Sequence, residues 1–351
     1  MNDVIPDLQS RIRTAAENLS PLRSRGGGTK DFYGAALEGD IIDVRPYAGI
    51  IDYEPKELVV TVRAGTPLVE IESALASERQ MLPFEPPHFG AGATIGGAVA
   101  TGLSGPRRAY TGAVRDFVLG ARILDGRGQD LRFGGRVIKN VAGYDVSRLM
   151  SGAMGTLGVL LDLSFKVLPQ PPAEITLRFE MDETLAIDTM NRWAGQPLPL
   201  SATSWHQGIL LVRLSGAAAG VAAAKQKMGG EEVKDAEALW RELREHRAAF
   251  FQAAVPLWRL SVPSTTLPLD VGATQWIEWG GALRWLAADV NAPPLRETVD
   301  AAGGHATLFR GGNKSVGVFH PLGGGLAMIH RRLKQTFDPA GILNAGRMDN
   351  F

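Results

Sequence analysis

The sequence of 351 residues contains no cysteine. This absence excludes disulfides, a thiolate nucleophile, thiolate-bound zinc, iron–sulfur clusters and any cofactor linked through cysteine. The chain also carries no net charge, because 37 Lys and Arg residues balance 37 Asp and Glu residues. A neutral chain has no broad electrostatic attraction for nucleic acid, and little charge repulsion opposes its association with a partner subunit.

Long apolar runs and metal-ligand patterns are also missing. No run of about 18 uncharged apolar residues occurs, so we expect no transmembrane helix. The polar N-terminus lacks the apolar core of a signal peptide, which favours a cytoplasmic location. The six histidines do not pair at metal-ligand spacing, so we expect no metal site. His246 and His330 lie in charged stretches, which predicts solvated helix faces for both.

The length predicts about two domains, and Pro169–Pro172 interrupts regular structure where we place the boundary. Hydrophobic periodicity before the boundary predicts helices over 5–19 and 67–75, strands over 41–44, 58–63 and 159–167, and a hairpin over 117–133. The stretch 83–112 has little periodicity and reads as irregular. Beyond the boundary, the order of the expected elements suits a ferredoxin-like layer. These elements are a strand over 175–181, a helix over 183–194, strands over 201–205 and 209–214, and a helix over 217–228. Further helices are expected over 235–251, 295–302 and 326–337.

Three glycine-rich segments could bind a phosphate-bearing cofactor. The first, RGGGTK over 25–30, can turn consecutive backbone N–H groups toward one anion, although a flexible surface turn is equally compatible. The second, GAGATIGG over 90–97, has the spacing GxGxxxG and follows prolines instead of a strand, which disfavours a Rossmann turn. The third, over 139–158, precedes the strand 159–167, and its glycines fit either close approach to a ligand or a tightly packed turn.

Four motifs of this sequence occur in a fixed order: RGGGTK, GATIGG, KNVAGYDVSRLMSGAMGTLG (139–158) and FDPAGILNAGRM (337–348). Together they resemble the FAD-binding domain of the vanillyl-alcohol oxidase and p-cresol methylhydroxylase superfamily. Ala345 replaces the proline usual in the last motif. The length and the lack of large insertions are most similar to the FAD-binding E-subunit family of bacterial glycolate oxidases. The resemblance implies an α+β fold: a two-part FAD-binding domain over 1–170, a smaller ferredoxin-like α+β cap domain over 171–320, and a C-terminal segment, 321–351, that returns to the FAD domain.

The resemblance also implies which residues bind FAD. The first loop, with the arginine before it, and the second loop would enclose the pyrophosphate. The third loop would hold the pyrophosphate–adenosine region. Residues 101–105 would lie nearer the flavin ring, and the returning C-terminus would approach that ring. The implied set is Arg25, Gly26, Gly27, Gly28, Thr29, Gly92, Ala93, Thr94, Gly96, Gly97, Thr101, Ser104, Gly105, Gly155, Thr156, Gly158, Val159 and Asn344. Because Thr29 follows the first glycines and cysteine is absent, we expect FAD to be held without a covalent bond.

The resemblance implies a role in oxidation of glycolate or D-lactate to the 2-oxo acid, within a complex that also contains a paralogous catalytic FAD subunit and an iron–sulfur subunit. Catalytic subunits of this kind are expected to carry a GHxGDGNxH-type motif, whereas this chain has GGHATLFRGG over 303–312, with His305 alone. That departure favours an accessory or electron-transfer flavoprotein. No catalytic residue is assigned, and His305, Arg310 and Arg347 are weak candidates for which ordinary surface roles compete.

Two other functions compete with the accessory role. A self-sufficient FAD-dependent 2-hydroxy-acid oxidase is disfavoured by the missing histidine motif, and a non-catalytic scaffold is disfavoured by the intact glycine loops. The expected location is cytoplasmic, with peripheral attachment at the inner membrane face through partners as the alternative.

Overall fold

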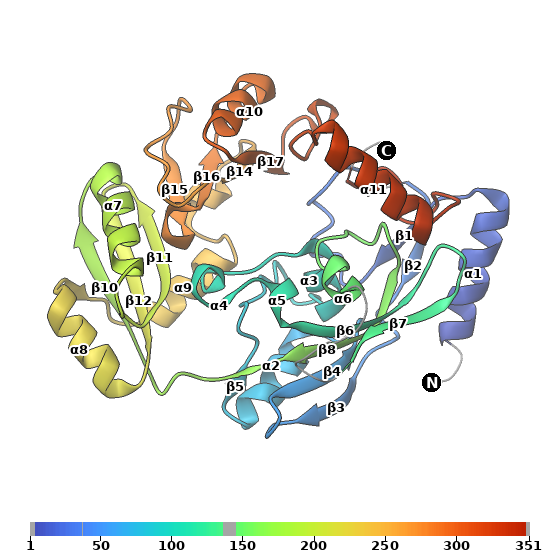
Figure 1. Cartoon of the computed structure of the whole chain (residues 1–351), viewed down its shortest axis with the longest axis horizontal. Coiled ribbons are helices and arrows are strands. Elements are labelled where there is room, and N and C mark those ends of the chain that lie inside the picture. Colours follow the sequence, from blue (N-terminus) through green and yellow to red (C-terminus); the bar gives the residue numbers. More distant parts are fainter. Residues whose placement is uncertain (1–3, 37, 136–144, 349–351) are drawn as a thin grey trace. The chain divides into compact units, whose positions relative to one another are not determined.

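The computed structural model describes residues 4–36, 38–135 and 145–348, and the chain divides into two compact units (Figure 1). The first unit comprises the described residues of Met1–Ser104, Ala113–Pro169 and Pro321–Phe351, and the second those of Gly105–Gly112 and Gln170–His320. Residues 105–112 therefore belong with the second unit, although the sequence on both sides of them belongs to the first. Within the described ranges, no helix is long and apolar enough to cross a membrane.

A five-stranded antiparallel sheet, in the order β3-β4-β8-β6-β7, forms the centre of the first unit. Two short pairs, parallel β1–β2 and antiparallel β5–β9, accompany it. The elements of this unit are α1 (Val4–Asn18), β1 (Leu22–Arg25), β2 (Asp40–Asp43), β3 (Ile50–Glu54), β4 (Val59–Arg63), α2 (Leu68–Ser77), β5 (Gln80–Met81), α3 (Ile95–Thr101), α5 (Val114–Phe117), β6 (Val118–Leu124), β7 (Asp130–Gly134), α6 (Val146–Leu149), β8 (Val159–Lys166), β9 (Leu168–Pro169) and α11 (Gly324–Phe337).

The C-terminal segment of the chain lies beside β1. The N–H of Leu22 donates to the carbonyl of Ile342 at 2.8 Å, and the N–H of Asn344 donates to the carbonyl of Leu22 at 2.8 Å. Helix α1 covers this junction with one apolar stripe, since Leu8 and Ile12 are one helical turn apart and both are buried in the same core. These contacts bring residue 344 next to the loop that follows β1.

The second unit contains one eight-stranded sheet in the order β13-β10-β12-β11-β15-β16-β14-β17. Its first half has the β-α-β-β-α-β element order of a ferredoxin-like layer. In Figure 1, α7 and α8 lie against this half, and α10 accompanies the other half. The elements are α4 (Arg108–Thr111), β10 (Ala173–Glu180), α7 (Glu183–Ala194), β11 (Leu200–His206), β12 (Ile209–Gly216), α8 (Ala218–Met228), β13 (Glu231–Glu232), α9 (Ala236–Arg244), η1 (Ala249–Gln252), β14 (Leu257–Ser261), β15 (Gln275–Glu278), η2 (Trp279–Gly281), β16 (Leu283–Ala287), α10 (Ala292–Ala301), β17 (His305–Arg310) and η3 (Lys314–Val316).

Three local predictions from the sequence are wrong. The stretch 83–112 is not irregular throughout: α3 begins after Thr94, whose hydroxyl accepts the N–H of Gly97 at 3.2 Å, and it ends at the left-handed Gly102. The helix predicted over 235–251 ends at Arg244. His246 has a φ of 53° and is 5% exposed, stacked on Phe251 with ring centroids 4.2 Å apart, so it lies in a core instead of on a solvated helix face.

Candidate functional site

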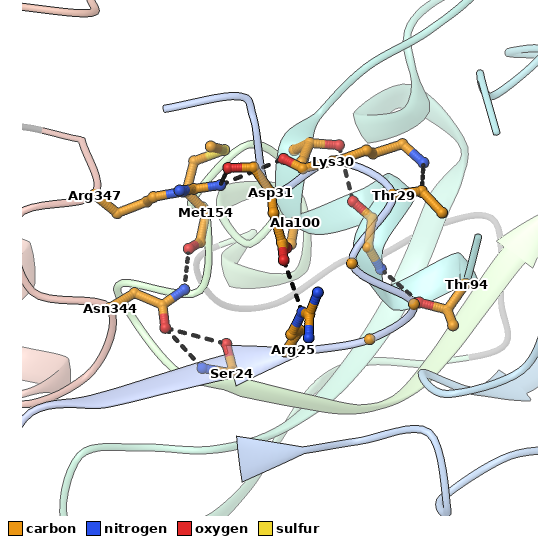
Figure 2. A pocket seen from close by; sticks show the side chains of 15 residues that line it. Ser24, Arg25, Thr29, Lys30, Asp31, Thr94, Ala100, Met154, Asn344 and Arg347 are labelled. Atoms are coloured by element: carbon orange, nitrogen blue, oxygen red, sulfur yellow. Dashed lines mark hydrogen bonds and ion pairs between the residues drawn. The ribbon is translucent and has the colours of Figure 1, made fainter. Parts of the chain in front are cut away.

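Two adjoining hollows in the first unit form one groove, which we call the glycine groove. They share Ser24, Arg25, Gly26, Gly97 and Ala100. Its outer part, drawn in Figure 2, is lined in addition by Gly27, Gly28, Thr29, Lys30, Asp31, Thr94, Thr101, Met154, Asn344 and Arg347. Its inner part is lined in addition by Val44, Ala64, Gly96, Gly155, Gly158, Val159 and Leu160. All three glycine-rich segments therefore contribute to one concave surface.

The first loop, residues 26–29, presents a row of backbone donors to this groove. Among the described residues, the four amide N–H groups of this loop have no hydrogen-bond acceptor. Gly28 has a φ of 72°, which favours glycine and turns the chain back on itself. Consecutive unbonded amides in such a turn form a concavity that binds anions, phosphate in particular. The groove is therefore suited to a pyrophosphate without a dedicated lysine.

The first and second loops pack backbone against backbone. A Cβ atom added to Gly27 would lie 1.5 Å from the carbonyl oxygen of Gly92, and one added to Gly26 would lie 2.3 Å from the hydroxyl oxygen of Thr94. On the other side of the second loop, a Cβ on Gly96 would lie 2.7 Å from the carbonyl oxygen of Ala64. Glycine is required here because any side chain would push the loops apart and open the groove.

Asn344 joins the third loop to β1 (Figure 2). Its side-chain oxygen accepts the N–H of Ser24 at 2.8 Å, and its amide nitrogen donates to the carbonyl of Met154 at 2.6 Å. Gly155 has a φ of 73°, and a Cβ there would lie 2.5 Å from the Asn344 amide nitrogen. The side chain of Asn344, 4% exposed, is thus used to fix the groove's walls.

Arg347, at the rim of the groove, holds the segment that directly follows the first loop. Its guanidinium donates to the carbonyls of Ala35, Lys30 and Asp31 at 2.7, 3.3 and 3.1 Å. Burial lowers the pKa of Arg347 from its ordinary value. At the groove itself, Arg25 pairs with Asp31 at 2.7 Å, and both side chains are about half exposed, so this pair contributes little to stability.

Some residues expected at the cofactor do not line the groove. Gly92 and Ala93 support the first loop and α2 from behind. Thr156 lines an adjoining cavity of about 620 Å³ beside α11, which shares Asn344 and Arg347 with the groove. Ser104 accepts the N–H of Val114, and Gly105 belongs to the second unit, where its carbonyl accepts the indole N–H of Trp279 at 3.1 Å.

The remaining candidates for chemistry lie in the second unit or outside the described residues. His305 is exposed on β17, and desolvation together with the charges of Arg259 and His320 lowers its pKa. Arg310 donates to the carbonyl of Phe251, and burial lowers its pKa. The part of the third motif at 139–144 lies outside the described residues. In the described ranges, no three His, Asp or Glu side chains are grouped to hold a metal.

Sequence reasoning missed several lining residues, namely Ser24, Lys30, Asp31, Val44, Ala64, Ala100, Met154 and Leu160. Lys30 is the last residue of the RGGGTK motif, and Ser24 and Asp31 directly flank that motif, so adjacency alone could have included all three. Ala64 and Val44 carry no such signal, because they reach the groove only through the pairing of β1 with β2 and the packing of α3 on the end of β4.

Comparisons with known proteins agree with this geometry. The family model of the FAD binding domain matches residues 5–134. Two solved structures share the fold. A 4-ethylphenol oxidase from Gulosibacter chungangensis has a TM-score of 0.70 and 15% identity, and the match covers 99% of this chain and 88% of that chain. An alkyldihydroxyacetonephosphate synthase has a TM-score of 0.68 and 14% identity, and the match covers 97% of this chain and 75% of that chain. Fold and site together define an FAD-binding oxidoreductase, and the predicted fold class and cofactor are confirmed.

Sequence relatives narrow this class. The glycolate oxidase subunit GlcE of Escherichia coli K12 is 48% identical over 341 residues, which are 97% of this chain and 96% of that protein. The chain belongs to this GlcE family, as predicted. The glycolate oxidase subunit GlcD of Bacillus subtilis is 30% identical over 208 residues, which cover 58% of this chain and 44% of that protein. A D-lactate dehydrogenase of Anaerostipes hadrus is 32% identical over 168 residues, 47% of this chain and 35% of that protein.

Proposed function

We propose that this chain is the accessory FAD subunit of a glycolate oxidase complex, beside a paralogous FAD subunit that oxidises glycolate or D-lactate and an iron–sulfur subunit. The observation that carries the proposal is the near full-length likeness to a glycolate oxidase subunit, combined with a groove to which all three glycine-rich segments contribute. The chain works on the cytoplasmic side and meets the inner membrane only through its partners.

The groove fits FAD. The amides of residues 26–29 would hold the pyrophosphate, and the inner part, where Gly158 and Val159 line the wall, would take the adenosine. FAD, when bound, supplies hydride acceptance and electron transfer. The protein's part is to bind and orient it: the loops contact each other without side chains between them, and Asn344 and Arg347 keep their spacing fixed.

FAD is held without a covalent bond in this proposal. Thr29 occupies the place after the first glycines, and the ring of His88, before the second loop, lies 3.1 Å from a carboxylate oxygen of Glu72. Acid precipitation of the purified protein should therefore release all of its flavin into the supernatant. Flavin that stays with the pellet would contradict non-covalent binding.

Two readings of one sample test the accessory role. The purified full-length chain should be yellow, and anaerobic glycolate or D-lactate should not bleach its flavin in the absence of partner subunits. A colourless protein would favour the non-catalytic scaffold. Rapid bleaching by either acid without a partner would favour the self-sufficient oxidase, and the accessory role would be wrong.

A further inference from the structure

The C-terminal end of α11 carries an ion pair that is almost fully enclosed. Lys334 and Asp338 are one helical turn apart, with 2.6 Å between the ammonium nitrogen and a carboxylate oxygen, and their side chains are 19% and 0% exposed. A charge pair at this depth compensates for its lost hydration only when its remaining donors and acceptors are also bonded. The other hydrogen bonds of these two side chains meet that condition, and they reach well beyond α11.

The ammonium group of Lys334 joins three segments of the chain. Besides its bond to Asp338, it donates to the carbonyl of Thr156 at 2.8 Å and to the carbonyl of Leu343 at 2.7 Å. An ammonium group has three donors, so all of them are used. Thr156 belongs to the third glycine-rich segment, and Leu343 directly precedes Asn344. One cation therefore ties both segments to the end of α11.

The carboxylate of Asp338 holds the same C-terminal turn. Its two oxygens accept the N–H of Ile342 at 3.2 Å and the N–H of Leu343 at 2.7 Å. The ion pair thus binds both backbone groups of Leu343, since the carboxylate takes its N–H and the ammonium takes its carbonyl. We call Lys334 and Asp338 the α11 clamp.

Both segments that the α11 clamp holds continue directly into the glycine groove. Gly155, next to Thr156, lines the inner part, and Asn344 lines the outer part. Asn344 also donates to the carbonyl of Met154, two residues before Thr156, so it forms a second tie between the same two segments. Neither residue of the clamp lines the groove itself. The clamp therefore acts on the groove from outside, through the backbone.

We propose that Lys334 is a positioning residue for FAD binding. It acts through the carbonyls of Thr156 and Leu343, and it keeps the third glycine-rich segment and the C-terminal segment at the spacing that the groove requires. Binding groups hold their geometry only when a second layer of bonds fixes them, and the clamp supplies that layer at this wall. The inference rests on the assignment of the inner part of the groove to the adenosine of FAD.

Isothermal titration calorimetry of the full-length apoprotein tests this role, with FAD and ADP as the probes. Lys334→Met should weaken FAD binding about tenfold, the lower end of the loss seen when a partner that orients a binding group is removed. ADP carries the same adenosine and pyrophosphate, so its affinity should fall by a similar factor. A residue with a structural role alone would lower the free energy of unfolding and leave the Kd of the folded protein unchanged.

A second variant keeps the test decisive if Lys334→Met does not fold. The single change leaves Asp338 as an unpaired buried charge, which is strongly destabilising. The double change Lys334→Met and Asp338→Asn removes that charge and keeps a side-chain oxygen as an acceptor, so this protein should fold and should bind FAD about tenfold more weakly. Circular dichroism confirms folding. A folded double variant with the wild-type Kd for FAD, or with ADP binding unchanged, would overturn the positioning role.

Arg331→Met is the matched control. Arg331 lies on the same helix and is exposed, so its replacement removes one positive charge from α11 without touching the clamp. This variant should bind FAD and ADP with the wild-type affinities. An equal loss in Arg331→Met and in the double variant would attribute the effect to the charge of α11 instead of to the bonds of Lys334, and the proposal would be wrong.

The positioning role and the assignment of the groove fail separately. If Gly27→Ala loses FAD while the clamp variants keep it, the groove holds the pyrophosphate and Lys334 has no positioning role. If neither Gly27→Ala nor the clamp variants change the Kd, the groove does not bind FAD and both are refuted. The accessory role in a complex is measured with the partner subunits present, and it depends on neither result.

Discussion

Replacing Gly27 by alanine should abolish retention of FAD, whereas replacing Gly92, which packs directly against Gly27 from the second loop, should not. The two glycines face each other, yet a Cβ on Gly27 would lie 1.5 Å from the Gly92 oxygen, whereas a Cβ on Gly92 would lie 3.5 Å from the Gly27 oxygen. A Cβ atom essentially never approaches a heavy atom closer than 3.0 Å, so in Gly27→Ala the loops must separate by at least roughly 1.5 Å. Gly92→Ala makes only an ordinary contact.

A shift of that size moves amides of the first loop out of hydrogen-bond range of a pyrophosphate held by the opposite wall. Losing two charge-assisted hydrogen bonds at about 1.5 kcal/mol each weakens FAD binding by roughly 100-fold. The assay is fluorescence titration of the apoprotein with FAD, with circular dichroism to confirm folding. An unchanged Kd in a folded Gly27→Ala protein, or an equal loss in Gly92→Ala, would refute the assignment of this groove to the pyrophosphate.

Two further predictions concern the stability of each unit. Burial lowers the pKa of His246 from 6.5 to about 3, so the unfolded chain takes up the proton first, and the stability that the neutral ring contributes above pH 6.5 is lost as the pH falls. Between pH 7 and pH 5 this loss is about 2 kcal/mol in the free energy of unfolding. Urea unfolding should therefore show that the stability of His246→Phe changes less with pH than that of the wild type. An equal change in the two proteins would contradict the buried, neutral state of His246. Asn344→Ala leaves the N–H of Ser24 and the carbonyl of Met154 without partners, which should cost about 2 kcal/mol in the free energy of unfolding. Asn313→Ala, which removes an exposed cap at η3, is its control, and equal losses in the two variants would count against the bracing role of Asn344.

The glycine loops could be predicted from the sequence because their requirement is local. A run of glycines indicates a place where side chains cannot be accommodated, and Gly26, Gly27 and Gly96 have no room for a Cβ atom. The alternating strand β8 and helix α7 were likewise recognisable, because one core face repeats at a fixed period. Helix α3 was missed because its seven residues are mostly small and show almost no apolar contrast.

Contacts between distant parts of the chain could not be read in this way. The motif around Asn344 pointed to the cofactor, but its bonds to Ser24 and Met154 depend on how the C-terminal segment pairs with β1. The attachment of residues 105–112 to the second unit depends on Trp279, far along the sequence. The pairing register of β14 with β17 is likewise not revealed by any periodicity in the sequence.

The measurement that tests the central claim most directly is the glycolate-oxidising activity of the reconstituted complex with this chain present or omitted. Expression together with the paralogous FAD subunit and the iron–sulfur subunit should recover one assembly in which glycolate reduces an external acceptor. Omission of this chain, or its replacement by the FAD-free Gly27→Ala variant, should remove most of that activity. Full activity without the chain, or no co-purification at all, would contradict its role as the FAD-binding accessory subunit.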